Sequence, residues 1–122
     1  MTREVVFVFG SNRQGRHGKG AAKEAACKFG AIHGQPEGLQ GKSYAIITKE
    51  LRSERPPVTL DLIADGVQRF ISFARSHPEM IFLVTPIGCG LAGFRAEQVA
   101  PLFAGSPENV QLPDIFLKVI LG

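Results

Sequence analysis

Four short apolar runs, separated by segments of mixed polarity, are the dominant pattern of the chain. Residues 5–9, 43–48, 80–85 and 115–121 are each mostly apolar, and the first of them (VVFVF) is entirely β-branched or aromatic. Nearly uninterrupted apolar runs of this length are typical of strands that are covered on both faces. We therefore predict four strands at these positions, the last of them a terminal strand.

Three segments between these runs carry helical signals. Alanines recur with helical spacing over residues 21–29, and Gly30 stands where a C-terminal cap belongs. Thr59 offers an N-cap for a second helix that runs to about residue 76. Residues 95–103 predict a third, short helix. Strands and helices thus alternate along the whole sequence.

The order βαβαβαβ predicts an α/β fold, with a mostly parallel (mixed) central sheet between two helical layers in a three-layer α/β/α arrangement. Residues 33–42 and 51–57 are rich in glycine, proline or charge and should be irregular loops. Right-handed crossovers in such a fold place the ligand-binding loops at the carboxyl ends of the strands.

Two glycine-rich loops, residues 10–20 and 85–94, follow the first and third apolar runs directly. Glycine permits positive φ and lets a ligand approach bare backbone. A strand that feeds such a loop, with a helix beyond it, aims backbone N–H groups at phosphate. In the first loop Arg13, Arg16, His17 and Lys19 also favour an anion. The alternative is a pair of tight turns and a solvated basic loop. Two such loops on one small sheet favour a ligand site.

The composition fits one domain that spans residues 1–122, with 44% hydrophobic and 20% charged residues. No apolar run approaches the roughly 20 residues of a membrane span, and Met1 leads straight toward the first strand without a signal peptide. We expect a cytoplasmic protein with no membrane partner. The net charge of +3 permits phosphate-rich partners. Without a basic tract or interleaved aromatic residues, no strong nucleic-acid binding is expected.

Two cysteines are too few and too far apart for a metal site. Cys27 falls on the first predicted helix and Cys89 in the second glycine loop, so neither a CxxC motif nor a zinc pattern exists. We predict no metal and no cofactor. Cys89 is a candidate nucleophile, but no base for it is evident in the sequence.

Four strings of the sequence form a recognisable set: RHGKGAA at residues 16–22, KFG at 28–30, IITK at 46–49 and PIGCGL at 86–91. In this order they resemble the macro domain family, the small α/β modules that bind ADP-ribose. The greatest likeness is to the terminal ADP-ribose protein glycohydrolase branch. The resemblance extends from the first strand to about residue 103. It implies a macro-domain fold and a partner that is ADP-ribose, or protein or nucleic acid modified with it.

The resemblance also implies roles for individual residues. In that branch the loop matching residues 88–94 wraps the phosphates and the distal ribose, and the loop matching 11–20 lies against the diphosphate. The lysine matching Lys49 attacks the anomeric carbon, which an amine does only when neutral. Asn12 and His17 are the candidates for aiding the ribose or the proton transfers. The ligand-binding residues so implied are Gly10, Ser11, Gly18, Gly20, Ile87, Gly88, Cys89, Gly90, Leu91, Ala92, Gly93 and Phe94.

Two features depart from the pattern of that branch. Its catalytic aspartate follows the Gly-Cys-Gly-Leu string, and here that position is Ala92. Alanine can neither take a proton nor orient water, so release of a lysine-bound intermediate lacks its helper. Glu50 and Glu54 are the candidate substitutes in the neighbouring loop. The second departure is at the start of the chain, where no residue maps to the acid that grips the adenine amino group.

The sequence thus supports functions from different classes. The first is binding of ADP-ribose or a related NAD-derived nucleotide, with ADP-ribosyl glycohydrolase activity through Lys49 as its extension. The first alternative is a non-catalytic module that binds a nucleotide sugar. The second alternative is a basic domain that interacts with nucleic acid or protein. Lys49 favours turnover, whereas Ala92 favours binding alone.

Overall fold

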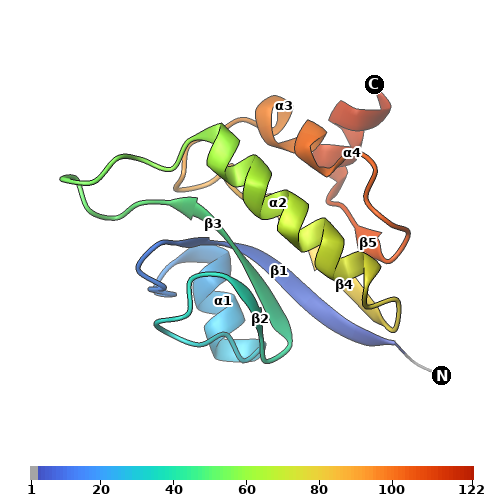
Figure 1. Cartoon of the computed structure of the whole chain (residues 1–122), viewed down its shortest axis with the longest axis horizontal. Coiled ribbons are helices and arrows are strands. Elements are labelled where there is room, and N and C mark those ends of the chain that lie inside the picture. The colour runs from blue at the N-terminus through green and yellow to red at the C-terminus, as the bar shows by residue number, and fades with distance from the viewer. Residues whose placement is uncertain (1–2) are drawn as a thin grey trace.

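A five-stranded sheet with the order β2-β3-β1-β4-β5 forms the centre of the computed structural model, which describes residues 3–122 (Figure 1). The strands are β1 (Glu4–Asn12), β2 (Gly38–Gln40), β3 (Ser43–Lys49), β4 (Met80–Val84) and β5 (Val110–Gln111). Central β1 pairs in parallel with β3 and β4, and β4 pairs in parallel with β5. Only the short β2 is antiparallel to its neighbour. The predicted α/β class with a mostly parallel, mixed sheet is confirmed.

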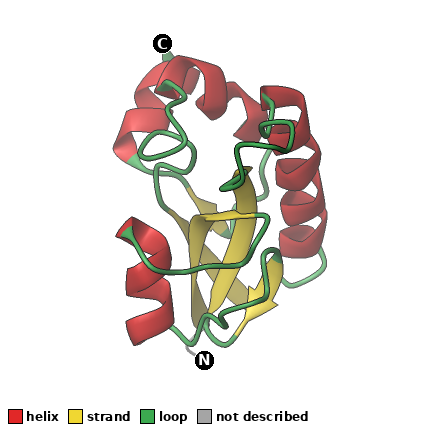
Figure 2. Cartoon of the chain, turned by 90° about the vertical axis from the view of Figure 1, so that its left-hand side faces the viewer, coloured by secondary structure: helices red, strands yellow, loops and turns green. Residues whose placement is uncertain are grey.

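Helices cover both faces of this sheet, as Figure 2 shows from the side. They are α1 (Gly20–Lys28), α2 (Leu60–Arg75), the single turn α3 (Ala96–Val99), the 3₁₀ turn η1 (Ala100–Phe103) and α4 (Asp114–Leu121). Helix α1 lies on one side of the sheet and the long α2 on the other. None of the helices within residues 3–122 is long and apolar enough to cross a membrane.

Alternation along β1 divides the core into two parts. Val6 and Val8 point toward α2 and pack in the same cluster as Phe70, whereas Phe9 packs with Ala25 of α1. All five side chains are fully buried. A central parallel strand buried on both faces reads as a continuous apolar run, which is why the sequence marks it so clearly.

The core on the α2 side of the sheet extends beyond α2 through aromatic rings. Phe103 of η1 lies 6.2 Å from Phe70 of α2 and 5.6 Å from Phe116 of α4, measured between ring centroids. These three rings are buried. They fasten the C-terminal part of the chain to α2.

The caps of the two longer predicted helices are as expected. Thr59 accepts a hydrogen bond from the backbone N–H of Leu62 at 3.3 Å, which caps α2. Gly30, just beyond α1, has a φ of 75°, a conformation that an L side chain rarely adopts. The predicted bounds of both helices agree with the structure to within about two residues.

The predicted terminal strand over residues 115–121 is wrong, because this segment forms helix α4. The backbone N–H of Phe116 donates to the carbonyl of Pro113 at 2.9 Å, and Asp114 occupies the first turn. A seven-residue apolar run does not by itself distinguish a strand from a buried helix. The place beside β4 is taken by β5, where the N–H of Phe82 donates to the carbonyl of Asn109 at 2.8 Å.

Two smaller boundaries also differ from prediction. Residues 33–42, predicted as a loop, contain β2, which hydrogen-bonds to β3. Strand β1 continues to Asn12, so that Gly10 and Ser11 belong to the strand rather than to the loop. The parallel ladder continues to Lys49 of β3, with a bulge before Asn12, and holds these residues extended. The sequence predicted that the N-terminus leads straight into the first strand. Met1 and Thr2, which belong to that prediction, lie outside the described residues.

Candidate functional site

One cavity of about 540 Å³ opens at the carboxyl ends of β1, β3 and β4. Loop 1 (residues 13–19) leads from β1 to α1, and loop 2 (residues 85–95) leads from β4 to α3. Both loops contribute to its wall, as do the ends of β1 and β3 and the first turn of α1. The lining residues are Gly10, Ser11, Asn12, Arg16, Gly18, Lys19, Gly20, Ala21, Ala22, Thr48, Lys49, Leu51, Thr85, Pro86, Ile87, Gly88, Gly90, Leu91 and Ala92.

The N-terminus of α1 faces this cavity without a cap. Gly20, Ala21 and Ala22 form the first turn, and all three line the cavity. The N-cap residue Lys19 offers no side-chain hydrogen bond. Within residues 3–122 the three N–H groups donate to no protein acceptor. They therefore present partial positive charge to the cavity, reinforced by the helix dipole.

Loop 2 is folded by its own backbone. The N–H of Phe94 donates to the carbonyl of Gly88 at 2.8 Å, and that of Gly93 donates to the carbonyl of Gly90 at 3.0 Å. Gly88 and Gly93 have φ values of 74° and 81°, which glycine adopts without strain. These turns give loop 2 a defined shape without a ligand.

The same folding leaves four N–H groups of loop 2 without an acceptor. Gly88, Gly90, Leu91 and Ala92 line the cavity, and none of their N–H groups donates to an acceptor in the described chain. A Cβ atom added to Gly90 would meet no other atom within 4 Å, so the space over this backbone is open. The second wall of the cavity thus resembles the first in offering bare amides to an anion.

The charges around the cavity are of one sign. Arg16, Lys19 and Lys49 line it, and no aspartate or glutamate from residues 3–122 does. Across the same described residues, none of the three cations forms an ion pair. Uncompensated cations beside free amides favour an anionic ligand.

Of the candidate catalytic residues, Lys49 and Asn12 line the cavity. Lys49 ends β3 and is half-buried. The amide of Asn12 is engaged, because its Nδ2 donates to the carbonyl of Arg16 at 2.8 Å and its Oδ1 accepts from the N–H of Arg16 at 2.9 Å. Asn12 therefore closes loop 1, and Lys49 is the side chain whose amine remains available.

His17 does not line the cavity, contrary to the role considered for it. Its ring is buried, its Nε2 lies 3.1 Å from Oε1 of Gln40, and it meets the ring of Phe9 edge-on. Its backbone N–H donates to Nδ1 of His33 at 3.2 Å. Because Oε1 can only accept, the Nε2 of His17 carries the proton. His17 anchors loop 1 to β2 and to the segment that precedes it.

Most of the predicted ligand-binding residues do line the cavity, but three of loop 2 do not. Gly93 shapes the loop, and Phe94 packs against the core. Cys89 is half-buried, and burial, with Glu97 nearby, raises the pKa of its thiol, which opposes a nucleophilic role. Sequence reasoning missed several lining residues that flank strand ends or lie in the first turn of α1, and the boundaries of these elements were the signal for them. These are Ala21, Ala22, Thr48, Leu51, Thr85 and Pro86.

Glu50 and Glu54 do not replace the missing aspartate, since neither lines the cavity. The side chain of Glu50 is 1% exposed and accepts hydrogen bonds from Arg13 Nη1 at 3.2 Å, from Gln14 Nε2 and from the N–H of Arg52 at 2.9 Å. The bond from Arg52 is the main cause that lowers the pKa of this carboxyl. Glu54 is exposed. Ala92, in contrast, does lie at the cavity wall.

Comparison with the models of protein families and with the curated proteins gives no match. Among solved structures, the chain is similar to a protein of unknown function from Bacteroides thetaiotaomicron. The TM-score is 0.64 and the sequence identity 20%, over 92% of this chain and 88% of that chain. At this level of identity the likeness establishes the fold, so the chain shares its α/β architecture with that protein.

Proposed function

We propose that the cavity binds ADP-ribose or a related NAD-derived nucleotide, with the diphosphate between the N-terminus of α1 and loop 2. One observation carries this proposal. Three residues of the first turn of α1 and four of loop 2 line the same cavity, and the N–H groups of all seven have no acceptor within residues 3–122. Each set is suited to one phosphate group, and two sets on one cavity suit two linked phosphates.

The size and charge of the cavity agree with such a ligand. Its volume of about 540 Å³ falls in the range of ordinary small-molecule sites, roughly 300–1,000 Å³. Its lining holds three cations and, among the described residues, no carboxylate. Three of the four sequence strings that resemble macro domains, at residues 16–22, 46–49 and 86–91, contribute to the cavity wall. The fold and these strings together support assignment to that family.

Binding is the function that the side chains support best, and a covalent step at Lys49 is its extension. The hydroxyls of Thr48 and Thr85 donate to the carbonyls of Ser11 and Val8 at 3.2 and 2.8 Å, and so are engaged. Ala92 supplies no base. The cavity, as far as residues 3–122 line it, therefore offers the amines of Lys19 and Lys49 but no carboxylate to activate water for a second step. Of the two, Lys49 at the end of β3 is the one to which the resemblance assigns the attack.

Calorimetry with ADP-ribose, AMP and UDP-glucose tests the proposal. We expect ADP-ribose to bind, and AMP to bind much more weakly because it lacks the second phosphate and the distal ribose. If UDP-glucose binds as well as ADP-ribose, the alternative of a general nucleotide-sugar module is the better description. If none of the three binds, the proposed function is wrong.

A further inference from the structure

A segment of seven residues projects from the body of the protein beside the cavity. This arm, residues 51–57, connects β3 to α2 and extends to the left in Figure 1. Its first residue, Leu51, lines the cavity with 44% of its surface exposed. Every residue of the arm is exposed. A partner attached to a ligand in the cavity would therefore meet the arm.

Both ends of the arm are fastened to loop 1. At the start, the N–H of Leu51 donates to Oε1 of Gln14 at 3.1 Å, and Glu50 accepts from Arg13 and Gln14. At the end, Nη1 of Arg13 donates to the carbonyl of Pro56 at 2.7 Å. Loop 1 and the arm are thus held in one arrangement. Such preorganisation lowers the entropic cost of binding a partner.

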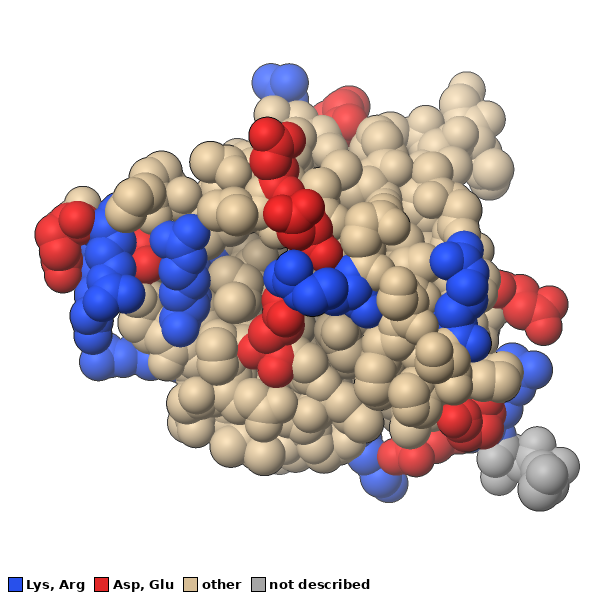
Figure 3. Space-filling view, in the orientation of Figure 1, with Lys and Arg blue, Asp and Glu red and all other residues tan. Residues whose placement is uncertain are grey.

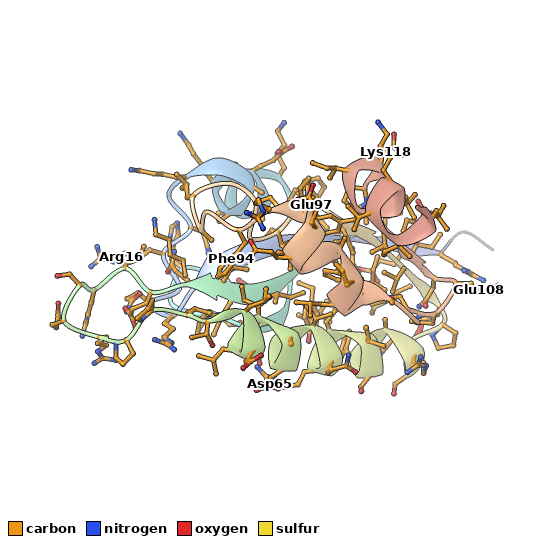
Figure 4. The ribbon with its side chains drawn as sticks, turned by 90° about the horizontal axis from the view of Figure 1, so that it is seen from above. Arg16, Asp65, Phe94, Glu97, Glu108 and Lys118 are labelled. Carbon is orange, nitrogen blue, oxygen red and sulfur yellow. The ribbon has the colours of Figure 1, made fainter. Side chains whose placement is uncertain are left out.

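The arm also carries net positive charge, because it holds Arg52 and Arg55 against one acidic residue, the exposed Glu54. In the space-filling view, Lys and Arg gather at the end of the molecule where the arm lies (Figure 3). Arg52 and Arg55 are exposed and form no ion pair with any residue from 3 to 122. Arg16, which lines the cavity, points out toward the same end (Figure 4). By contrast, Arg69 on α2 is paired with Glu37 at 2.7 Å.

Apolar side chains flank the mouth of the cavity as well. Leu51 on the arm and Leu91 on loop 2 both line the cavity, with exposed fractions of 44% and 65%. No aromatic residue lies on the arm or, among the described residues, in the cavity lining. Leucines and arginines without aromatic rings suit a polypeptide with carboxylates, which arginine holds in bidentate fashion. A single strand of nucleic acid would instead use an aromatic platform for its bases.

We propose that the arm, with Arg52 and Arg55, is a docking surface for an acidic polypeptide segment that carries the ligand of the cavity. This inference rests on the proposed function. The phosphates are bound in the cavity, and the carboxylates that flank the modified residue pair with the two arginines outside it. The arm thereby selects which modified polypeptides bind.

Two synthetic peptides test this selection. Each carries one ADP-ribose through a linkage that cannot be cleaved by attack at the anomeric carbon. Glutamates flank the modified residue in one peptide, and glutamines flank it in the other. We expect the acidic peptide to bind roughly three- to tenfold more tightly, as two exposed ion pairs allow. Because exposed pairs are screened, the difference should vanish at about 1 M salt.

Variants of the arm separate docking from ligand binding. Arg52→Ala with Arg55→Ala should abolish the preference for the acidic peptide and leave the affinity for free ADP-ribose unchanged, which also shows that the variant is folded. Lys118→Ala removes an exposed cation on α4, which Figure 4 places at the opposite end of the molecule from Arg16. This control should keep the full preference.

The possible results are distinguishable. If free ADP-ribose and both peptides bind equally well, the docking surface is refuted and the proposed function stands. If neither free ADP-ribose nor either peptide binds, the proposed function fails and the inference fails with it. If an ADP-ribosylated single-stranded DNA binds more tightly than the acidic peptide, and the arm variant loses that gain, the arm serves nucleic acid instead and the proposal is wrong.

Discussion

Lys49 and Ala92 line the same cavity and have opposite consequences for chemistry. Lys49 provides an amine that can form a bond to carbon, whereas Ala92 provides no group that can take a proton from water. A cavity with a nucleophile and no general base favours formation of an adduct over its release. This conclusion depends on the tertiary structure, because Glu50 is engaged with Arg13 and Arg52 away from the cavity.

We predict that an ADP-ribosylated glutamyl peptide leaves a covalent adduct on Lys49. The neutral amine bonds to the anomeric carbon, the bond from that carbon to the glutamyl oxygen breaks, and glutamate leaves as a carboxylate with the electron pair. The ammonium so formed gives its proton to solvent. Intact mass spectrometry detects the ADP-ribose adduct on the protein.

Two variants check the assignment of this step. Lys49→Ala should remove the adduct and keep much of the reversible binding of ADP-ribose. Ala92→Asp should release free ADP-ribose faster, by about a hundredfold, the lower end of what a general base contributes. A wild-type protein that shows neither adduct nor turnover on modified protein or DNA would restrict the function to binding.

Gly90 offers a direct test of the phosphate position, because its backbone lies at the cavity wall beneath open space. Its φ is not positive, so a side chain is tolerated without backbone strain. Gly90→Val should raise the Kd for ADP-ribose by at least about tenfold, or about 1.4 kcal/mol. Its melting temperature should stay close to that of the wild type. Gly90→Ala should have a smaller effect, and unchanged affinity in both variants would rule out this site.

At the scale of elements, the structure couples loop 1 to the arm through a buried carboxylate. Glu50 sits between Arg13 and Gln14 of loop 1 and the backbone of Arg52 in the arm. The same loop is anchored on its other side, where the carbonyl of Gly15 accepts from the N–H of Gly34 at 2.9 Å. Loop 1 is therefore held from two directions before any ligand arrives.

This coupling predicts a pH dependence of stability. The folded protein holds the pKa of Glu50 below its ordinary value, chiefly through the hydrogen bond from Arg52. A carboxyl of this kind contributes stability in full above the unfolded-state pKa of about 4.3, and that contribution is lost as the pH falls through the lower folded value. The free energy of unfolding in urea should therefore fall as the pH is lowered from about 5 to about 3, across and below that unfolded-state pKa.

Glu50→Gln should show a smaller fall over this pH range than the wild type, because glutamine does not titrate. Glu54→Gln is the matched control, since Glu54 is exposed and forms no ion pair with another described residue. Its fall should equal that of the wild type. Identical pH profiles for all three proteins would show that the hydrogen bonds accepted by the Glu50 carboxylate do not contribute to stability.

For the whole molecule, the distribution of charge favours a small anion over a long polyanion. Acidic and basic side chains are mixed over the face in Figure 3, although basic ones predominate at the end that carries the arm. We predict that single-stranded DNA or RNA binds with a Kd weaker than about 10 μM at physiological salt, as expected for non-specific contacts to few phosphates. A mobility-shift assay measures this, and sub-micromolar binding without sequence preference would contradict it.

The sequence determined those features that depend on short segments. The apolar run of β1 and the glycines of residues 10–20 and 85–94 placed both loops at strand ends, because local conformational preferences and burial patterns are written in consecutive residues. From this the α/β class and a cavity wall made of both loops were predictable.

The tertiary structure decided the features that depend on distant partners. Residues 115–121 form a helix in which the ring of Phe116 packs against the ring of Phe103. A short apolar run is compatible with a helix or a strand until such a tertiary contact is in place. His17 faces the interior because Gln40 accepts its Nε2–H there. Tertiary packing also decides which backbone N–H groups remain free. The acceptor of such a group can lie far away in the sequence, so the local sequence does not show whether the group is paired.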